Sequence, residues 1–175
     1  MTQRQFYDWQ TLGGGSDVLA LVNALEKHEI PWCMIGGLAV NHWAAEPMAT
    51  ADVDLVIAAG RVDEAVAVLT ELGFADNRFE WSVNLKGQSK VSIQISTEAI
   101  YQEFPARAVP ADVHGILMRV ASLEDTLRGK LAAYSDPGRR SSKRQKDLAD
   151  ISRLVEVYPH LLAVLPQNVA LRLES

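Results

Sequence analysis

The stretch IGGLAVNHWAAEPMATADVDLVI, residues 35–57, carries the strongest signal in this chain. It contains the glycine pair Gly36-Gly37, a spacer of fourteen residues, and then Asp52-Val53-Asp54. Side chains at positions i and i+2 of an extended strand point to the same side, so Asp52 and Asp54 are expected to share one face of a strand over 53–58. Hard divalent cations prefer carboxylate oxygens as ligands. The pair therefore predicts a site for one or two Mg²⁺ ions.

The glycine pair follows an expected strand over residues 32–35 and opens an expected helical stretch from Leu38. Glycine lets the backbone approach a ligand closely, and the free N–H groups at a helix start favour phosphate. A plain strand-to-helix turn and a pair of solvated acids on an edge strand are the alternatives. The apolar run Leu55–Ile57 favours a buried strand, in which two acids need a function.

Length and composition place further limits on the interpretation. The chain has 175 residues, of which 48% are apolar, so it can form one domain with a substantial core, or one domain with a helical appendage. We expect a cytoplasmic protein, because no apolar stretch is long enough for a membrane span and the N-terminus lacks a signal region. The single Cys33 is expected to be a buried, inert thiol. The net charge of −5 argues against a general nucleic-acid binder.

The hydrophobic pattern predicts a mixed α/β (α+β) fold, with a small mixed sheet flanked by helices. We expect a flexible lead-in over 1–15, a core over 16–121, and a C-terminal helical part over 122–175 that packs on the core. Ser16 and Ser122 are predicted to cap helices. The expected helices cover 16–28, 62–72, 123–134, 144–157 and 161–165. The expected strands include a hairpin of 79–85 with 90–96 and an extended piece over 113–120.

The glycine pair, spacer and Asp-x-Asp motif resemble the nucleotidyltransferase superfamily. The sequence of this stretch is most similar to small bacterial minimal nucleotidyltransferases and the AbiEii/AbiGii toxin family. The resemblance covers roughly residues 16–157, since SLEDTLRGKLAAY and RRSSKRQKDLADISRLV also resemble that family's C-terminal helices. It implies a nucleoside triphosphate substrate, Mg²⁺ at Asp52 and Asp54, and nucleotide contacts from Gly36, Gly37, Thr50, Lys130 and Lys146. Asp147 also matches the tail motif.

The third carboxylate is where this chain departs from the family pattern. Active members usually carry a further Asp on a later strand, which helps to bind metal and accepts the proton of the attacking hydroxyl. The matching strand here, 90–96, offers Gln94, or Ser92 in another register. An amide cannot act as a base near neutral pH. Glu80 or Glu98 could substitute, and the sequence leaves this open.

Three functions remain possible from the sequence. The first is Mg²⁺-dependent transfer of a nucleotide to an RNA, a protein or a small molecule such as an aminoglycoside, with Asp52, Asp54 and Gln94 at the catalytic centre. The second is a catalytically impaired nucleotidyltransferase fold that binds a nucleotide, or a protein partner in a toxin–antitoxin pair. The third is an unrelated soluble α/β binding domain.

A basic segment bears on the choice of acceptor. Five cations lie within residues 139–146: Arg139, Arg140, Lys143, Arg144 and Lys146. Such a cluster could hold a triphosphate or an RNA backbone, or it could be a solvated loop and first helical turn. The acidic balance of the whole chain fits an aminoglycoside acceptor instead.

Overall fold

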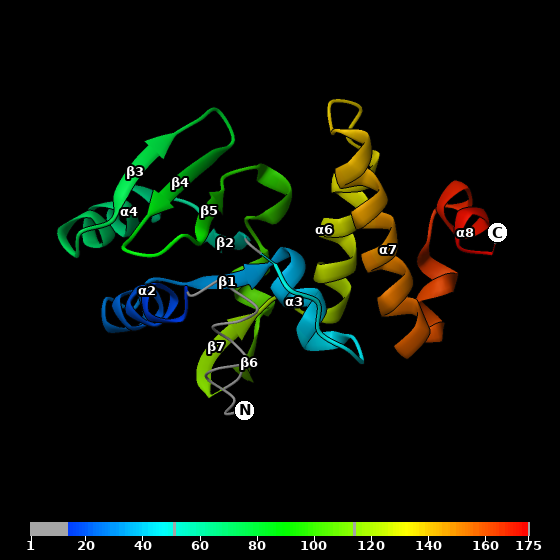
Figure 1. Ribbon diagram of the computed structural model, residues 1–175, viewed down its shortest axis with the longest axis horizontal. Helices are drawn as coiled ribbons and strands as arrows, with labels where there is room; N and C mark the ends of the chain where they lie inside the picture. The colour runs from blue at the N-terminus through cyan, green and yellow to red at the C-terminus, as the bar shows by residue number, and fades with distance from the viewer. Residues whose placement is uncertain (1–13, 51, 114, 175) are drawn as a thin grey trace.

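The computed structural model describes residues 14–50, 52–113 and 115–174, which form one mixed sheet with helices around it (Figure 1). The strand order is β3-β4-β5-β2-β1-β7-β6. The strands are β1 Trp32–Ile35, β2 Asp52–Ile57, β3 Ala75–Arg78, β4 Ser82–Lys86, β5 Ser92–Ser96, β6 Val109–Val113 and β7 Ile116–Val120. The mixed α/β class expected from the hydrophobic pattern is confirmed.

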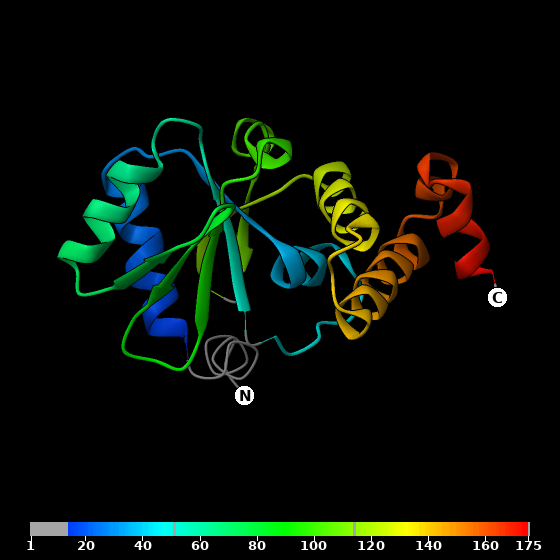
Figure 2. The same ribbon diagram turned by 90° about the horizontal axis from the view of Figure 1, so that it is seen from above.

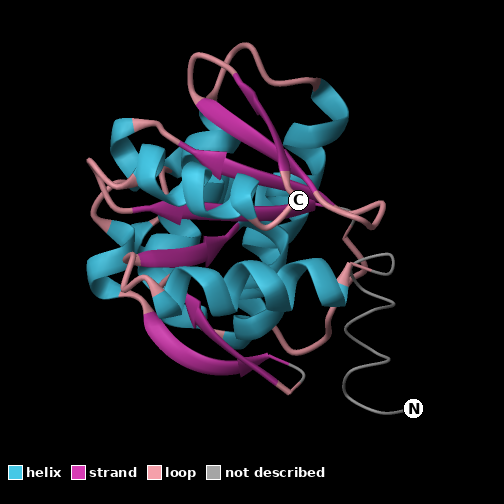
Figure 3. Cartoon of the chain, turned by 90° about the vertical axis from the view of Figure 1, so that its left-hand side faces the viewer, coloured by secondary structure: helices cyan, strands magenta, loops and turns pink. Residues whose placement is uncertain are grey.

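Two parallel pairings give the sheet its mixed character. β2 runs antiparallel to β1 and parallel to β5, while β1 runs parallel to β7; the pairs β3–β4, β4–β5 and β6–β7 are antiparallel. Strand β2 therefore lies inside the sheet, with the glycine-pair strand β1 on one side and β5 on the other. The strands fan out in Figure 3, as expected from the twist between neighbouring strands.

Helices cover both faces of the sheet (Figure 2). On one side lie α2 and α4, and on the other lie α3 and the C-terminal helices. The helical elements are α2 Gly15–Lys27, α3 Gly36–Trp43, α4 Val62–Glu71, η1 Ala99–Tyr101, α5 Phe104–Arg107, α6 Leu123–Ser135, α7 Ser141–Val157, η2 Pro159–Val164 and α8 Gln167–Leu173. No described helix is long and apolar enough to cross a membrane.

Alternation along β2 divides its side chains between two environments. Val53, Leu55 and Ile57 are buried in the main core, against α2 and α4. Asp52 and Asp54 point to the opposite face, as expected from the period of two. A smaller apolar cluster on that face contains Cys33 and Phe104. Cys33 is buried, as expected, and burial raises the pKa of its thiol to about 12.

The C-terminal helices share a core of their own with α3. Leu127 of α6 and Leu154 of α7 are buried together with Val40 of α3, and η2 and α8 add further apolar residues. The indole N–H of Trp43 donates to the carbonyl oxygen of Ala121 at 3.0 Å. Helix α3, which begins at the glycine pair, therefore links the sheet to the helical layer.

Two predicted helix starts have different outcomes. Ser122 caps α6, since its hydroxyl accepts a hydrogen bond from the Asp125 N–H at 3.1 Å. Ser16 is not a cap: α2 begins one residue earlier, with Gly14 at the N-cap position. The reason is tertiary, because a Cβ on Gly14 would overlap Val91 and the Asp17 carboxylate accepts from the Ser89 N–H at 2.8 Å.

The predicted extended piece over 113–120 is confirmed for β7, Ile116–Val120, but is wrong at its start. The structure divides this region into two antiparallel strands, β6 and β7. Gly115 has φ +84°, which glycine adopts readily, and its N–H donates to Asp112 Oδ1 at 2.7 Å. Strand β3 and helix α8 were not predicted, and most of the expected lead-in, residues 1–13, lies outside the described residues.

Candidate active site

A cavity of about 200 Å³ lies between the polar face of β2 and β5 and the helices α6 and α7. We call it the candidate pocket. Its strand wall contains Gly36, Asp52, Asp54, Gln94 and Ser96, and its helical wall contains Thr126, Gly129, Lys130, Ala133, Arg139, Lys143 and Asp147. Ile35, Glu98, Tyr101 and Asp125 complete the lining.

Asp52 and Asp54 occupy neighbouring positions on the polar face of β2. Burial, followed by the like charge of Asp52, raises the pKa of Asp54 to about 6. Lys130, Lys143 and Arg139 oppose this rise but do not cancel it. The ionised form of Asp54 is therefore disfavoured in the protein alone, mainly because the carboxyl is buried, and a bound cation would favour it.

The donor set at this pair fits Mg²⁺ bound together with a phosphorylated ligand. Mg²⁺ is typically held by one or two carboxylates plus substrate phosphates, not by an all-protein cage. The residues described here contain no cluster of three or more His, Cys, Asp or Glu side chains able to hold a metal ion. Asp52 and Asp54 would therefore supply the protein ligands, and phosphate oxygens would complete the coordination.

The glycine pair is shaped by its proximity to these acids. Gly36 has φ +69°, and a Cβ at this position would overlap the Asp54 carboxylate. A side chain is therefore excluded by both conformation and space. No described side chain caps the start of α3, whose N-cap residue is Ile35. The first N–H groups of α3 remain available for an anionic ligand next to Asp54.

Thr50 forms hydrogen bonds with the first residue of β2. Its hydroxyl donates to the Asp52 carbonyl at 3.2 Å and accepts from the Asp52 N–H at 3.3 Å. Thr50 is buried and is not among the residues that line the candidate pocket. It lies 3.4 Å from a Cβ position built on Gly37. Thr50 and Gly37 therefore form a second layer, which fixes where β2 begins.

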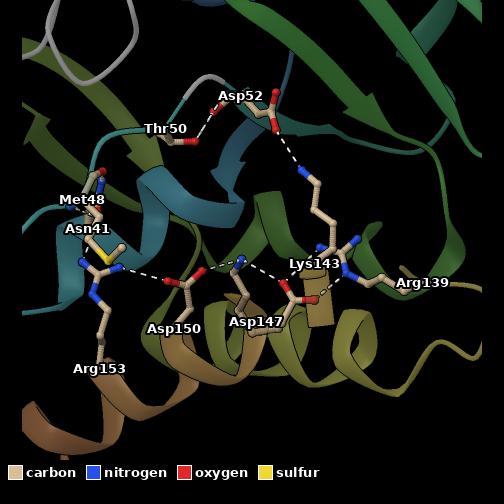
Figure 4. Close-up of polar contacts among 10 residues, drawn as sticks. Asn41, Met48, Thr50, Asp52, Arg139, Lys143, Asp147, Asp150 and Arg153 are labelled. Atoms are coloured by element: carbon tan, nitrogen blue, oxygen red, sulfur yellow. Dashed lines mark hydrogen bonds and ion pairs between the residues drawn. The ribbon is translucent and has the colours of Figure 1, made fainter. Parts of the chain in front are cut away.

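The helical wall is a chain of alternating charges (Figure 4). Lys130 Nζ lies 3.3 Å from Asp147 Oδ1 and 2.8 Å from Asp150 Oδ2. Arg139 also binds Asp147, with an Nη2–Oδ1 distance of 3.0 Å. Asp147 and Asp150 are buried, and the two acids together orient Lys130. Paired charges of this kind hold one another in a defined geometry.

A single cation bridges the two walls. Lys143 Nζ, at the start of α7, lies 3.5 Å from Asp52 Oδ2, and both side chains are about two-fifths exposed. An exposed pair of this length contributes little to stability. Lys143 is therefore free to move toward a phosphate if the acids of β2 bind a metal ion.

The spacer after α3 is tied to the same helical wall. The Asn41 amide donates to the Met48 carbonyl at 2.7 Å and accepts from the Met48 N–H at 3.0 Å. Arg153 of α7 donates to Asn41 Oδ1 at 2.9 Å and pairs with Asp150 at 3.0 Å. Met48 is thus part of a loop anchored through its backbone (Figure 4).

The structure brings most of the sequence-predicted residues together. Gly36, Asp52, Asp54, Gln94 and Lys130 line the candidate pocket. Lys146 does not, since it is exposed elsewhere on α7. The parallel β2–β5 pairing sets Gln94 directly opposite Asp54. Of the two acids considered as substitutes for a third carboxylate, Glu98 lines the pocket and Glu80 does not.

The basic segment 139–146 is divided between several roles. Arg139 and Lys143 face the candidate pocket. Arg144 instead donates to the Tyr134 carbonyl at 3.0 Å and lies over the Tyr134 ring. Arg140 is exposed, like Lys146. The segment is therefore not one continuous surface for a polyanion.

Sequence reasoning missed the end of the pocket beyond β5. Ser96 lies two residues after Gln94 on β5, so the alternation of the strand places both side chains on the same face. This spacing could have predicted Ser96 as a pocket residue. Tyr101 comes from η1, and burial, followed by the charge of Glu98, raises its pKa to about 12. Its hydroxyl is therefore a neutral hydrogen-bond donor. Gly129 lies inside α6, and a Cβ built at this position would be 3.4 Å from the Tyr101 ring. In the sequence, only the presence of a glycine in the middle of a predicted helix could have indicated this close approach.

Solved structures with the same fold include several nucleotidyltransferases. An antigenic nucleotidyltransferase-like protein from Paracoccidioides brasiliensis is 22% identical, with 86% of this chain and 77% of that chain covered and a TM-score of 0.57. ANT(2")-Ia in complex with adenylyl-2"-tobramycin is 13% identical, with 91% and 94% covered and a TM-score of 0.58.

Lincomycin-bound LnuA, a lincosamide antibiotic adenylyltransferase, is 11% identical, with 79% of this chain and 96% of that chain covered and a TM-score of 0.56. At these identities the likeness shows the fold alone. A search of curated protein sequences found no significant match. The model of the family described as "Nucleotidyl transferase AbiEii toxin, Type IV TA system" matches residues 18–173, nearly the whole chain. The chain therefore belongs to the AbiEii nucleotidyltransferase toxin family.

Proposed function

We propose that this protein binds a nucleoside triphosphate with Mg²⁺ in the candidate pocket and transfers the nucleotide to an acceptor hydroxyl. One observation carries the proposal: the Asp52/Asp54 pair lies between the uncapped start of α3 and the cations of the helical wall. The pocket thus offers carboxylates for a metal ion, and N–H groups and cations for phosphates, within one cavity.

Each group in the pocket has a defined part in this proposal. When bound at Asp52 and Asp54, Mg²⁺ would supply charge neutralisation for the triphosphate. The first N–H groups of α3 would bind phosphate oxygens, and Lys143 would turn from Asp52 to the same phosphates. Arg139 and Lys130 are held by Asp147, so their positive charges are already oriented toward the cavity.

The transfer itself joins the acceptor oxygen to the α-phosphorus while the bond to pyrophosphate breaks. The acceptor hydroxyl loses its proton in this step. Gln94 lies opposite Asp54, where a third acid would be expected, and its amide cannot take that proton. The proton passes to solvent unless Glu98, which lines the same pocket, accepts it, and the absence of a positioned base would cost about 10²–10⁴ in rate.

The position of Gln94 supports a second candidate function, in which the pocket binds a nucleotide but catalyses transfer weakly or not at all. Membership of the AbiEii family supports a role in a toxin–antitoxin pair under either function. The acceptor candidates are RNA, a protein and a small hydroxyl compound.

Labelled-nucleotide transfer assays distinguish these functions. The natural protein and the Gln94→Asp variant are compared with each of the four triphosphates, with bulk RNA, lysate protein and aminoglycosides as acceptors. We expect nucleotide binding by both proteins and faster transfer by Gln94→Asp. Robust transfer by the natural protein, unchanged by Gln94→Asp, would show that another group supplies the base. Failure of Mg²⁺-nucleotide to bind either protein would refute the proposed function.

A further inference from the structure

Three exposed apolar side chains belong to segments that adjoin residues of the candidate pocket. Phe79 and Trp81, in the turn between β3 and β4, are each 56% exposed, and Ile100, in η1, is 42% exposed. We call them the apolar rim. Single exposed apolar residues are ordinary on protein surfaces, but a group of large ones beside a pocket marks a binding surface.

Strand pairing brings the rim to the end of the pocket. The Trp81 carbonyl accepts a hydrogen bond from the Thr97 N–H at 2.9 Å, and Ser82 pairs with Ser96. Ser96 and Glu98, on either side of Thr97, both line the pocket. The turn after β3 reaches the segment that follows β5 in Figure 1. Ile100 directly precedes Tyr101, another lining residue, so both parts of the rim adjoin the same end of the cavity.

This end differs in charge from the helical wall. The cations that line the pocket, Lys130, Arg139 and Lys143, all come from the helical side. At the rim end, the charged lining residue is Glu98, and Glu80 stands between the two aromatic residues of the turn. The nearby Arg78 is occupied by Asp63 at 2.6 Å and Asp76 at 3.6 Å. Arg139 of the helical wall also acts on Tyr101 at this end, so it is the charge of the rim segments themselves, from Glu80 and Glu98, that suits an uncharged or cationic ligand better than a polyanion.

We propose that the apolar rim binds the acceptor of the reaction, and that this acceptor is a small hydroxyl compound, uncharged or cationic, with an apolar face. The inference rests on the proposed function, because it assigns the opposite wall to the triphosphate. Aromatic faces bind apolar surfaces and attract cations through their π-systems. Glu98 is placed to bind a cationic group or a hydroxyl of the same molecule.

The test uses three probes and the full chain, loaded with Mg²⁺ and a non-hydrolysable triphosphate. The probes are hexyl glucoside, its cationic counterpart hexyl glucosaminide, and a single-stranded RNA of ten nucleotides. Calorimetry gives their affinities for the natural protein and for Phe79→Ala with Trp81→Ala. The matched control is Leu117→Ala, since Leu117 is 72% exposed on β7 in the opposite half of the sheet.

We expect both glycosides to bind and the rim variant to weaken them about tenfold, the loss typical of removing one or two aromatic contacts. Glu98→Gln should weaken hexyl glucosaminide more than hexyl glucoside. Affinity for the triphosphate should stay within about twofold in the rim variant, and Leu117→Ala should change nothing. RNA should bind more weakly than either glycoside.

Two results would overturn this inference while leaving nucleotide transfer standing. One is that the glycosides fail to bind, or bind equally well to the rim variant. The other is RNA binding that is tighter than glycoside binding and depends on Phe79 and Trp81. Absence of triphosphate binding would instead refute the proposed function, so the two failures are distinguishable.

Discussion

The two walls of the candidate pocket differ in how far their acidic side chains are paired with cations. On the helical wall, the buried acids Asp147 and Asp150 are matched by Lys130, Arg139 and Arg153 at ion-pair distance. On the strand wall, Asp52 has one long contact to Lys143, and the pKa of Asp54 is raised to about 6. The buried acids of the helical wall are thus paired with cations in the protein alone, whereas the carboxylates of the strand wall gain most from an added cation. This contrast leads us to assign the metal ion to the strand wall, and to the helical wall a set of cations that buried acids hold in place.

The largest expected effect is on nucleotide affinity, when both carboxylates of the strand wall are removed. Asp52→Asn with Asp54→Asn should lower the affinity for Mg²⁺-nucleotide by at least about 100-fold, because the carboxylates that would bind the ion are gone. The variant should remain folded, since the charges removed repel each other. Calorimetry with and without Mg²⁺ measures the change, and circular dichroism checks the fold.

Glu124→Gln, in the first turn of α6, is the control for loss of an acid outside the pocket. It should bind Mg²⁺-nucleotide as the natural protein does. Undiminished affinity in the double variant would remove the metal role of β2.

On the helical wall, loss of an acid should destabilise the fold instead. Asp147→Asn leaves Lys130 and Arg139 without their shared partner in a buried position. Breaking a buried ion pair costs about 3–5 kcal/mol, and Arg139 retains some solvent contact, so we expect about 3 kcal/mol. Urea unfolding measures the difference, with the exposed Asp136→Asn as control. A stability change below about 1 kcal/mol would show that this network is not a scaffold.

On the strand wall, loss of an acid should instead stabilise the fold, and the size of the effect should depend on pH. The pKa of Asp54 rises from an ordinary 3.8 to about 6 on folding, so the folded state favours the protonated acid. Natural-protein stability should therefore fall as pH rises from about 4 to about 6 and then level off. Asp54→Asn should be more stable by about 3 kcal/mol at pH 7.5, because a shift of about two pKa units corresponds to that free energy, and about equal at pH 3.5.

Urea unfolding at several pH values without divalent ions tests this, and added Mg²⁺-nucleotide should stabilise only the natural protein. If Asp54→Asn is less stable at neutral pH, Asp54 has a favourable partner in the fold, and the contrast between the walls is lost.

The smallest effect is expected at the cation between the walls. Lys143→Ser should weaken nucleotide binding about fivefold, and the remaining affinity should depend less on salt, because one screened charge contact is removed. Lys146→Ser, one helical turn away on α7 but outside the pocket, is the matched control and should change neither quantity. Equal losses in the two variants would mean that nonspecific charge attracts the nucleotide.

Local sequence was enough to predict which side chains share the polar face of the strand wall. The i, i+2 spacing of Asp52 and Asp54, and the alternation that exposes Gln94, depend only on the period of a strand. The Ser122 cap depends on contacts within one helical turn. Such features could be predicted because every group involved lies within a few residues of the next.

The tertiary structure decided which of these groups meet. The parallel pairing of β2 with β5 set Gln94 opposite Asp54, and the packing of α6 against α7 selected Arg139 and Lys143 from five neighbouring cations while leaving Lys146 outside. Pairing of β4 with β5 likewise brought the apolar rim to the pocket. These contacts join residues far apart in the chain, and their energies depend on packing and burial of the whole fold, which no local pattern encodes.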